Sequence, residues 1–138
     1  MDEHYLFLSS DLSKDQYPSN EPGDFTIELP HPYDLSGSQW LCGLKEIQIS
    51  IAEDVVYVCS DICAESYAEN TMVPVLRALQ KSKGKNKLTY FSFENAMYVR
   101  IKPTVLNRVR LFIRGSRLER VNVKDSIVRC TLHFKKWK

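Results

Sequence analysis

The feature that most constrains this fold is an alternation of apolar with basic or polar residues in the last third of the sequence. Residues 108–114 nearly alternate in this way, with the apolar Phe112 on the basic parity, and the pattern returns in residues 127–134. A period of two residues is typical of a β-strand, in which successive side chains point to opposite faces. We therefore predict two strands that pair antiparallel through the 115–126 connection, with one apolar face and one basic face. The arginines of the basic face are Arg108, Arg110, Arg114 and Arg129.

Two paired strands are only marginally stable alone, so their apolar face needs a second layer. A third alternating segment lies at residues 97–102, and its outward Arg100 and Lys102 extend the predicted basic face. The inward residues of the three segments form the predicted core. They are Met97, Val99, Ile101, Val109, Leu111, Ile113, Val128, Leu132 and Phe134.

Earlier segments supply the remaining strands. The segment at residues 40–51 begins with apolar residues on both parities, which predicts a central strand that buries Trp40, Leu44 and Ile47. Further strand-like patterns occur at residues 5–8, 24–29, 55–59, 71–79 and 90–93.

Two of these segments contain prolines that bear on their ends. Pro30 is predicted to end the 24–29 strand, because proline cannot donate a hydrogen bond to a sheet. Residues 71–79 also fit one face of a helix, but Pro74 and the β-branched residues favour a strand. The polar residues 61–70 before it should cross an edge of the sheet.

About eight strands, with no long helical pattern and no internal repeat, predict an all-β fold. We expect one antiparallel β-sandwich domain over residues 1–138, for which the jelly roll is a candidate form. With 138 residues, 43% of them hydrophobic, the chain is large enough for a real core. No run of about 18 apolar residues occurs, and the N-terminus is acidic where a signal peptide would be basic, so we expect no contact with membranes.

The charges are unevenly distributed along the chain. Residues 1–76 contain 14 acidic and 2 basic residues, a net charge of −12, whereas residues 77–138 contain 3 acidic and 17 basic residues, a net charge of +14. If the two halves form separate surfaces, the molecule has an acidic face and a basic face. If their strands interleave, the charges mix.

Patterns typical of catalysis are missing from the sequence. No serine lies in a nucleophile-elbow pattern, and the sequence has no phosphate-binding glycine loop and no histidine-carboxylate metal spacing. His133 shares the polar parity of its strand, which predicts a surface histidine. Cys42, Cys59, Cys63 and Cys130 match neither a disulfide framework nor a zinc ribbon and are expected to be buried free thiols. We therefore predict no enzyme, no cofactor and no metal.

The basic residues are the candidate binding site, for nucleic acid or for a protein partner. They could neutralise phosphates, with Tyr98 and Phe112 stacking on bases. They could equally meet acidic faces of neighbouring copies, with Tyr33 or Tyr67 as exposed anchors, or simply protect strand edges. The candidate residues are Arg100, Lys102, Arg108, Arg110, Arg114, Arg129, Lys81, Lys83, Lys85 and Lys87.

Several motifs, taken in order, resemble a poorly characterised protein family encoded by Maverick/Polinton elements and related adintovirus-like DNA viruses. Members of that family carry an Asp-x-Gly turn in the final hairpin, where this chain has residues 115–120 in its place. The motifs are Phe25-Thr-Ile-Glu-Leu-Pro30, Leu35-Ser-Gly37, Trp40-Leu-Cys-Gly-Leu-Lys-Glu-Ile47, Val56-Tyr-Val-Cys-Ser-Asp61, Met72-Val-Pro-Val-Leu-Arg77, Tyr98-Val99 and Thr131-Leu-His-Phe-Lys135.

This resemblance implies a viral context, because such elements encode virion proteins and several of those are jelly rolls. It supplies no catalytic residue. The function that we expect is a non-enzymatic structural protein of a virus-like DNA element, a minor capsid or virion-assembly component that binds itself or another capsid protein. Its location would be the virion, and the host nucleus or cytoplasm during assembly. The alternative is a basic accessory protein that binds nucleic acid.

Overall fold

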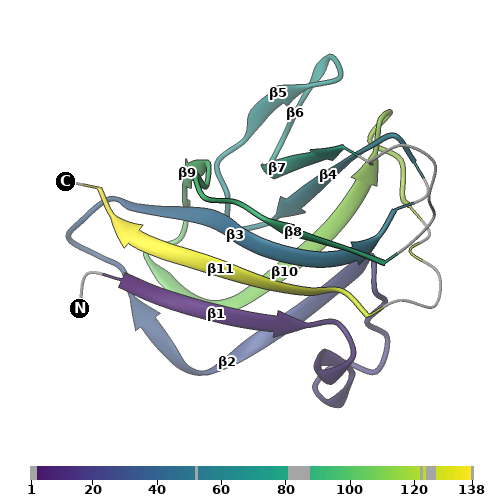
Figure 1. Ribbon diagram of the computed structural model, residues 1–138. Coiled ribbons are helices and arrows are strands. Elements are labelled where there is room, and N and C mark those ends of the chain that lie inside the picture. The colour runs from purple at the N-terminus through teal and green to yellow at the C-terminus, as the bar shows by residue number, and fades with distance from the viewer. Residues whose placement is uncertain (1–2, 52, 81–87, 122, 124–126, 138) are drawn as a thin grey trace.

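Two antiparallel β-sheets pack face to face in the computed structural model, which describes residues 3–51, 53–80, 88–121, 123 and 127–137 (Figure 1). The described residues include no helix that is long and apolar enough to cross a membrane. The elements are β1 (Glu3–Ser9), the 3-10 helix η1 (Leu12–Asp15), β2 (Asp24–Asp34), β3 (Trp40–Ser50), β4 (Val55–Ser60), β5 (Ser66–Ala68), β6 (Thr71–Val73), β7 (Val75–Gln80), β8 (Leu88–Ser92), β9 (Tyr98–Arg100), β10 (Val105–Gly115) and β11 (Arg129–Lys136).

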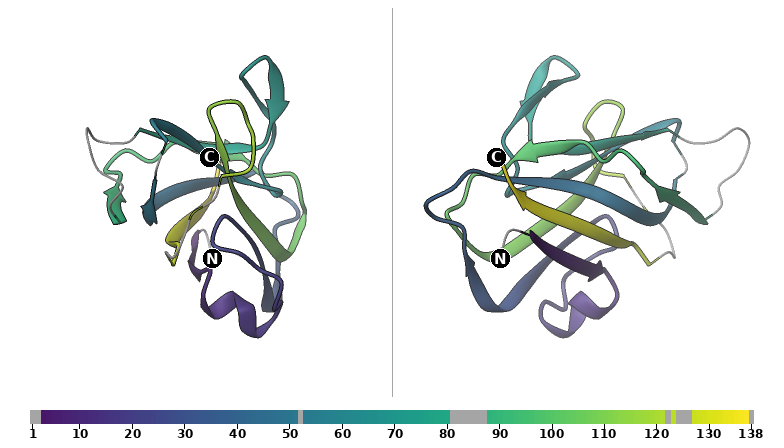
Figure 2. Two further views of the ribbon diagram at one scale, coloured as in Figure 1. Left: turned by 90° about the vertical axis from the view of Figure 1, so that its right-hand side faces the viewer. Right: turned by 60° about the vertical axis from the view of Figure 1, so that its left-hand side comes forward.

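The strand order is that of a jelly roll. Sheet A has the order β1-β11-β3-β8, with the short β9 also paired to β3, and sheet B has the order β2-β10-β4-β7. Eight principal strands thus form two four-stranded layers, in which strands early in the chain pair with strands late in the chain. The predicted antiparallel β-sandwich is therefore confirmed. The two layers are visible in the two rotated views (Figure 2).

The predicted core lies between the sheets. Trp40, Leu44 and Ile47 are 5%, 0% and 0% exposed on β3, which is the central strand of sheet A as its pattern predicted. The predicted core residues that are buried are Val109, Leu111, Ile113, Val128, Leu132 and Phe134, and those that pack half-buried against them are Val99 and Ile101. The prediction for Met97 is wrong. It is 58% exposed, because β9 begins only at Tyr98 and the strand parity does not extend to the residue before it.

The predicted pairing of the last two strands is wrong. β10 lies in sheet B between β2 and β4, whereas β11 lies in sheet A between β1 and β3. The chain between them passes from one layer to the other. Both apolar parities still point into the core, because the strands approach it from opposite sides.

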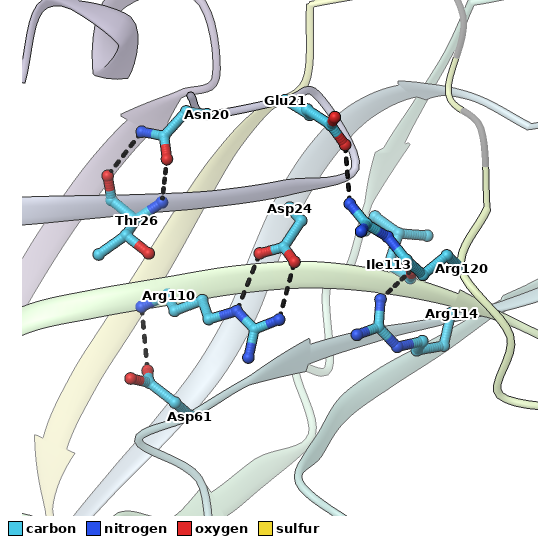
Figure 3. Close-up of polar contacts among 9 residues, drawn as sticks. All are labelled: Asn20, Glu21, Asp24, Thr26, Asp61, Arg110, Ile113, Arg114 and Arg120. Atoms are coloured by element: carbon cyan, nitrogen blue, oxygen red, sulfur yellow. Dashed lines mark hydrogen bonds and ion pairs between the residues drawn. The ribbon is translucent and has the colours of Figure 1, made fainter. Parts of the chain in front are cut away.

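The free edge of β2 is closed by side chains. The Asn20 amide accepts from the Thr26 N–H at 3.1 Å and donates to the Thr26 carbonyl at 2.8 Å, and Gln16 holds Glu28 in the same way at 2.8 and 2.9 Å (Figure 3 shows the Asn20 pair). The strand does not end at Pro30 as predicted. It runs on to Asp34, because on an edge strand a missing N–H costs no ladder hydrogen bond.

The short strand β5 was not predicted, and with β6 it forms a small hairpin. It turns at Glu69 and Asn70, which have φ of 47° and 65°, the left-handed values of a tight hairpin turn. Pro74 separates β6 from β7, so residues 71–79 form two strands rather than one. Val73 packs with Phe112 on the outer side of sheet B, and the hairpin stands out from the sandwich in Figure 1.

Candidate partner-binding surfaces

The acidic and basic halves of the sequence do not form separate surfaces. In sheet A, β1 and β3 from the acidic half alternate with β11 and β8 from the basic half, and in sheet B the basic β10 lies between the acidic β2 and β4. The jelly roll imposes this alternation by pairing early strands with late ones. Of the two alternatives that the sequence left open, the structure therefore has the interleaved one.

Opposite charges instead meet across neighbouring strands. Glu3 of β1 is in register with Lys135 of β11, and Glu28 of β2 is in register with Arg108 of β10. Such cross-strand pairs each contribute about 0.2–1 kcal/mol and disfavour other registers. Part of the charge asymmetry is thus used inside one molecule.

Arg110 is the centre of a polar network on the outer face of sheet B (Figure 3). Its Nε and Nη2 donate to the two carboxylate oxygens of Asp24 at 2.8 and 2.7 Å, and its backbone N–H donates to Asp61 Oδ1 at 2.9 Å. The Arg110 hydrogen bond lowers the pKa of Asp24, against the opposing effect of burial. Nearby, Arg120 binds Glu21 at 2.8 Å. Arg110 is therefore already neutralised by acids of the same chain.

Phe112 is not free to stack on a base. Its ring lies between the guanidinium groups of Arg110 and Arg114, whose carbons are 4.4 and 4.6 Å from its centroid. The β5–β6 hairpin covers it, and it is 8% exposed. Arg114 also donates from Nη1 to the Ile113 carbonyl at 3.3 Å. The arrangement packs the outer side of the sheet and leaves no platform for a nucleotide.

The predicted basic residues do not form one face. Arg108, Arg110 and Arg114 belong to β10 in sheet B, while Arg129 belongs to β11 in the other layer. Arg100 and Lys102 line a pocket of about 320 Å³ beside Trp40, at one end of the sandwich. The remaining candidates lie outside the described residues, and they are Lys81, Lys83, Lys85 and Lys87. Binding of a partner by any of these residues stays a prediction.

The outer face of sheet A carries a row of aromatic side chains that was not predicted. Along one row across the sheet lie Tyr5 of β1, His133 of β11, Gly43 of β3 and Tyr98 of β9. Phe7 is the next outward residue of β1 and is 77% exposed, and Tyr5 is 49% exposed. Hereafter this surface is called the aromatic face.

His133 is buried, and its prediction as a surface residue is wrong. It does point outward, but Tyr5 stacks on its ring at 4.5 Å between centroids and the Tyr98 ring stands edge-on at 5.6 Å. Its Nδ1 is 2.7 Å from the Tyr98 hydroxyl, and its Nε2 is 3.0 Å from Glu3 Oε1. His133 lies on the polar, outward side of its strand, but large side chains from neighbouring strands cover it there.

A groove of about 360 Å³ adjoins the aromatic face, between Phe7, Leu12 and Tyr90. Leu12 and Tyr90 are 69% and 60% exposed. Thr131 and Tyr90, which also line the groove, both donate hydrogen bonds to the Glu46 carboxylate. The sequence contained a signal for this surface, because residues 5–8 are apolar on both parities and only one parity can face the core.

The four cysteines are buried and free. Burial raises the pKa of Cys59, Cys63 and Cys130 to about 12, and it also raises that of Cys42, so these thiols stay protonated at neutral pH. All four are free and buried, as predicted. The described part of the chain has no group of three or more histidines, cysteines and carboxylates placed to hold a metal ion.

The Asp24–Arg110 pair should make stability depend on pH in acid. Because the folded pKa of Asp24 is lowered, its contribution is present at neutral pH and is lost as the pH falls below about 4, through the folded pKa. Asp24→Asn should lower the free energy of unfolding at pH 7 by about 0.5–1 kcal/mol, since the pair is partly exposed. Urea melts at pH 7 and pH 3 test this. The deficit should shrink at pH 3, and the exposed control Asp15→Asn should show neither effect; an equal deficit at both pH values would contradict it.

Comparison with known proteins supports the fold. No protein-family model matches the chain, and no curated protein sequence is significantly similar to it. Among solved structures, the crystal structure of the selenomethionine-labelled mavirus penton protein superimposes with a TM-score of 0.68 at 9% sequence identity. The match covers 98% of this chain and 100% of that one. At this identity the likeness shows a shared fold alone.

Proposed function

We propose that this protein is a non-enzymatic structural protein of a virus-like DNA element, a minor capsid component of the penton type. The observation that carries the proposal is the match of almost its whole length to a penton protein. Eight principal strands and the sheet order of a jelly roll agree with it. Its location would be the virion, with assembly in the host nucleus or cytoplasm.

Assembly in this proposal is with other copies or with another capsid protein. The groove beside the aromatic face supplies exposed apolar anchors in Leu12 and Tyr90, which are 69% and 60% exposed. Aromatic residues in such positions dominate binding energies at protein interfaces. Because acidic and basic strands alternate, attraction between opposed charged faces has no support as the main driving force.

Sedimentation and electron microscopy of the purified chain test the proposal. We expect closed rings of copies at micromolar concentration, because a repeated contact between unlike patches closes into a ring when its rotation permits. The rings should persist at 1 M salt, where the Debye length is only about 3 Å. A chain that stays monomeric at high micromolar concentration, both alone and with the capsid proteins encoded beside it, would overturn the proposal.

The alternative function, nucleic-acid binding, can be tested with the same purified protein. Filter binding of DNA should be weak at 50 mM salt. Arg110 and Arg114 are engaged within the chain, and the other basic residues that the structure describes are spread over both sheets. Tight binding that falls steeply between 50 and 200 mM salt would favour an accessory protein that contacts phosphates.

A further inference from the structure

The exposed edges of the two sheets differ in one respect that suggests a partner. Every outward backbone group of β2 from Asp24 to Glu28 is hydrogen-bonded. The N–H and C=O of Asp24 bond to the C=O and N–H of Glu21, each at 3.1 Å. The backbone groups of Thr26 and Glu28 bond to the side-chain amides of Asn20 and Gln16. Prolines follow further along that edge. Proteins protect edges in this way against the addition of foreign strands.

The edge of β1 has no such protection among the described residues. The Ser10 N–H donates to the Val128 carbonyl at 2.9 Å. In an antiparallel pair the backbone groups of alternate residues bond to the neighbouring strand, so those of the even-numbered residues of β1 point toward β11. The backbone groups of the odd residues therefore point away from the sheet. These residues are Glu3, Tyr5, Phe7 and Ser9, and no side chain or strand of the described chain binds their backbone groups.

We propose that β1 is a strand-addition edge that pairs antiparallel with β1 of a second copy of this chain about a two-fold axis. A row of free N–H and C=O groups is matched by another extended backbone, which restricts the occupant to a polypeptide strand. A second copy fits because the edge is complementary to itself. This contact is two-fold, whereas a ring uses unlike patches, so the inference goes beyond the proposed function and can fail separately from it.

If the two-fold axis passes beside Leu6, all four outward residues of β1 pair with outward residues of the other copy. Tyr5 then lies opposite Phe7 of the other copy, and Glu3 lies opposite Ser9. Both are pairs of odd residues, whose backbone groups point at the partner as hydrogen-bonded pairs require. The two aromatic pairs extend the aromatic face across the axis, and aromatic pairs stabilise a contact beyond the effect of the area that they bury.

The charges fit the same register. Ser9 is in register with the exposed Arg129 of β11, so Glu3 of the second copy lies one strand beyond a basic residue, with only a small serine between them. The two-fold axis repeats this contact on the other side. Because two seven-residue strands give an interface at the small end of the specific range, below about 1,200 Å², we expect micromolar association.

Disulfide trapping with two single variants tests both the edge and the register. Tyr5→Cys and Phe7→Cys are purified separately, mixed in the reduced state and oxidised. Cα atoms of a hydrogen-bonded pair are about 5.5 Å apart, which suits a disulfide, whereas like residues would be diagonal at about 7–8 Å or more. We expect a crosslinked dimer that is several-fold more abundant in the mixture than in either variant alone. The four native cysteines are buried and serve as an internal background.

Sedimentation of edge variants provides the second measurement. Phe7→Lys and Phe7→Pro should each weaken the two-fold dimer about tenfold or more, because they remove an aromatic anchor or an outward N–H without removing a hydrogen bond to β11. Met72→Lys is the matched control, since Met72 is 55% exposed on the distant β5–β6 hairpin. Equal crosslinking in the single variants, no crosslinking in the mixture, or association unchanged in the Phe7 variants would overturn the inference. Rings that persist in those variants would leave the proposed function standing.

Discussion

Leu132→Ala is expected to lower the free energy of unfolding by about 2–5 kcal/mol, which is a large part of the stability of a chain of this size. Leu132 is 0% exposed on β11, in the middle of the core between the sheets. Removing three carbon atoms there loses their transfer free energy and leaves a cavity that the two layers cannot close freely. Urea melts followed by circular dichroism measure the change.

Leu12→Ala is the matched control for this prediction, because the same atoms are removed from a side chain that is 69% exposed. It should change stability by less than about 0.5 kcal/mol. Leu111→Ala, on β10 in the opposite sheet, should behave like Leu132→Ala, since Leu111 is 1% exposed. If either core variant melted within about 0.5 kcal/mol of the wild type, the facing of its strand would be incorrect.

Gly43→Ala is expected to cost about 1–3 kcal/mol, although it adds a single methyl group on an outer face. A Cβ at Gly43 would lie 2.9 Å from two carbon atoms of the Tyr98 ring and 3.1 Å from the Met97 carbonyl. The ring cannot move away without cost, because its hydroxyl is bonded to His133 and Lys135 Nζ lies 3.9 Å from its centroid. The same urea melts measure the loss.

The double variant separates this clash from a general intolerance of alanine in β3. Tyr98→Ala removes the ring that Gly43 accommodates, so adding Gly43→Ala to it should cost clearly less than adding it to the wild type. Additive losses in the two variants would show that the strand, and not the contact with Tyr98, requires glycine. Loss of Tyr98 should also expose His133 to solvent, which a shift of its NMR resonances would report.

Local patterns in the sequence were sufficient for much of the fold. Alternation placed Leu111, Leu132 and Phe134 in the core, and apolar residues on both parities identified β3 as the central strand of its sheet. These predictions succeed because a strand buried on one face obeys a period of two wherever it lies. That residues 1–138 form one domain stays a prediction from length and composition.

The candidate binding site was predicted less well, because it depends on which strands are neighbours. The four arginines expected on one face are divided between the two sheets, since β10 and β11 belong to different layers. His133 has a polar parity yet is covered by Tyr5 and Tyr98, which come from strands far away in the sequence. No pattern confined to one segment records such a neighbour.

The sequence by itself determined that this chain forms a β-sandwich. It also determined which parity of most strands is buried, because burial of a strand on one side requires an apolar face within that segment. Only the tertiary structure decided how the charges and the outer faces are arranged. A jelly roll places early strands beside late ones, so an acidic half and a basic half meet as cross-strand pairs such as Glu28 with Arg108. The same pairing leaves Tyr5 and Phe7 on an exposed edge, and strand order is a property of the whole chain rather than of any one segment.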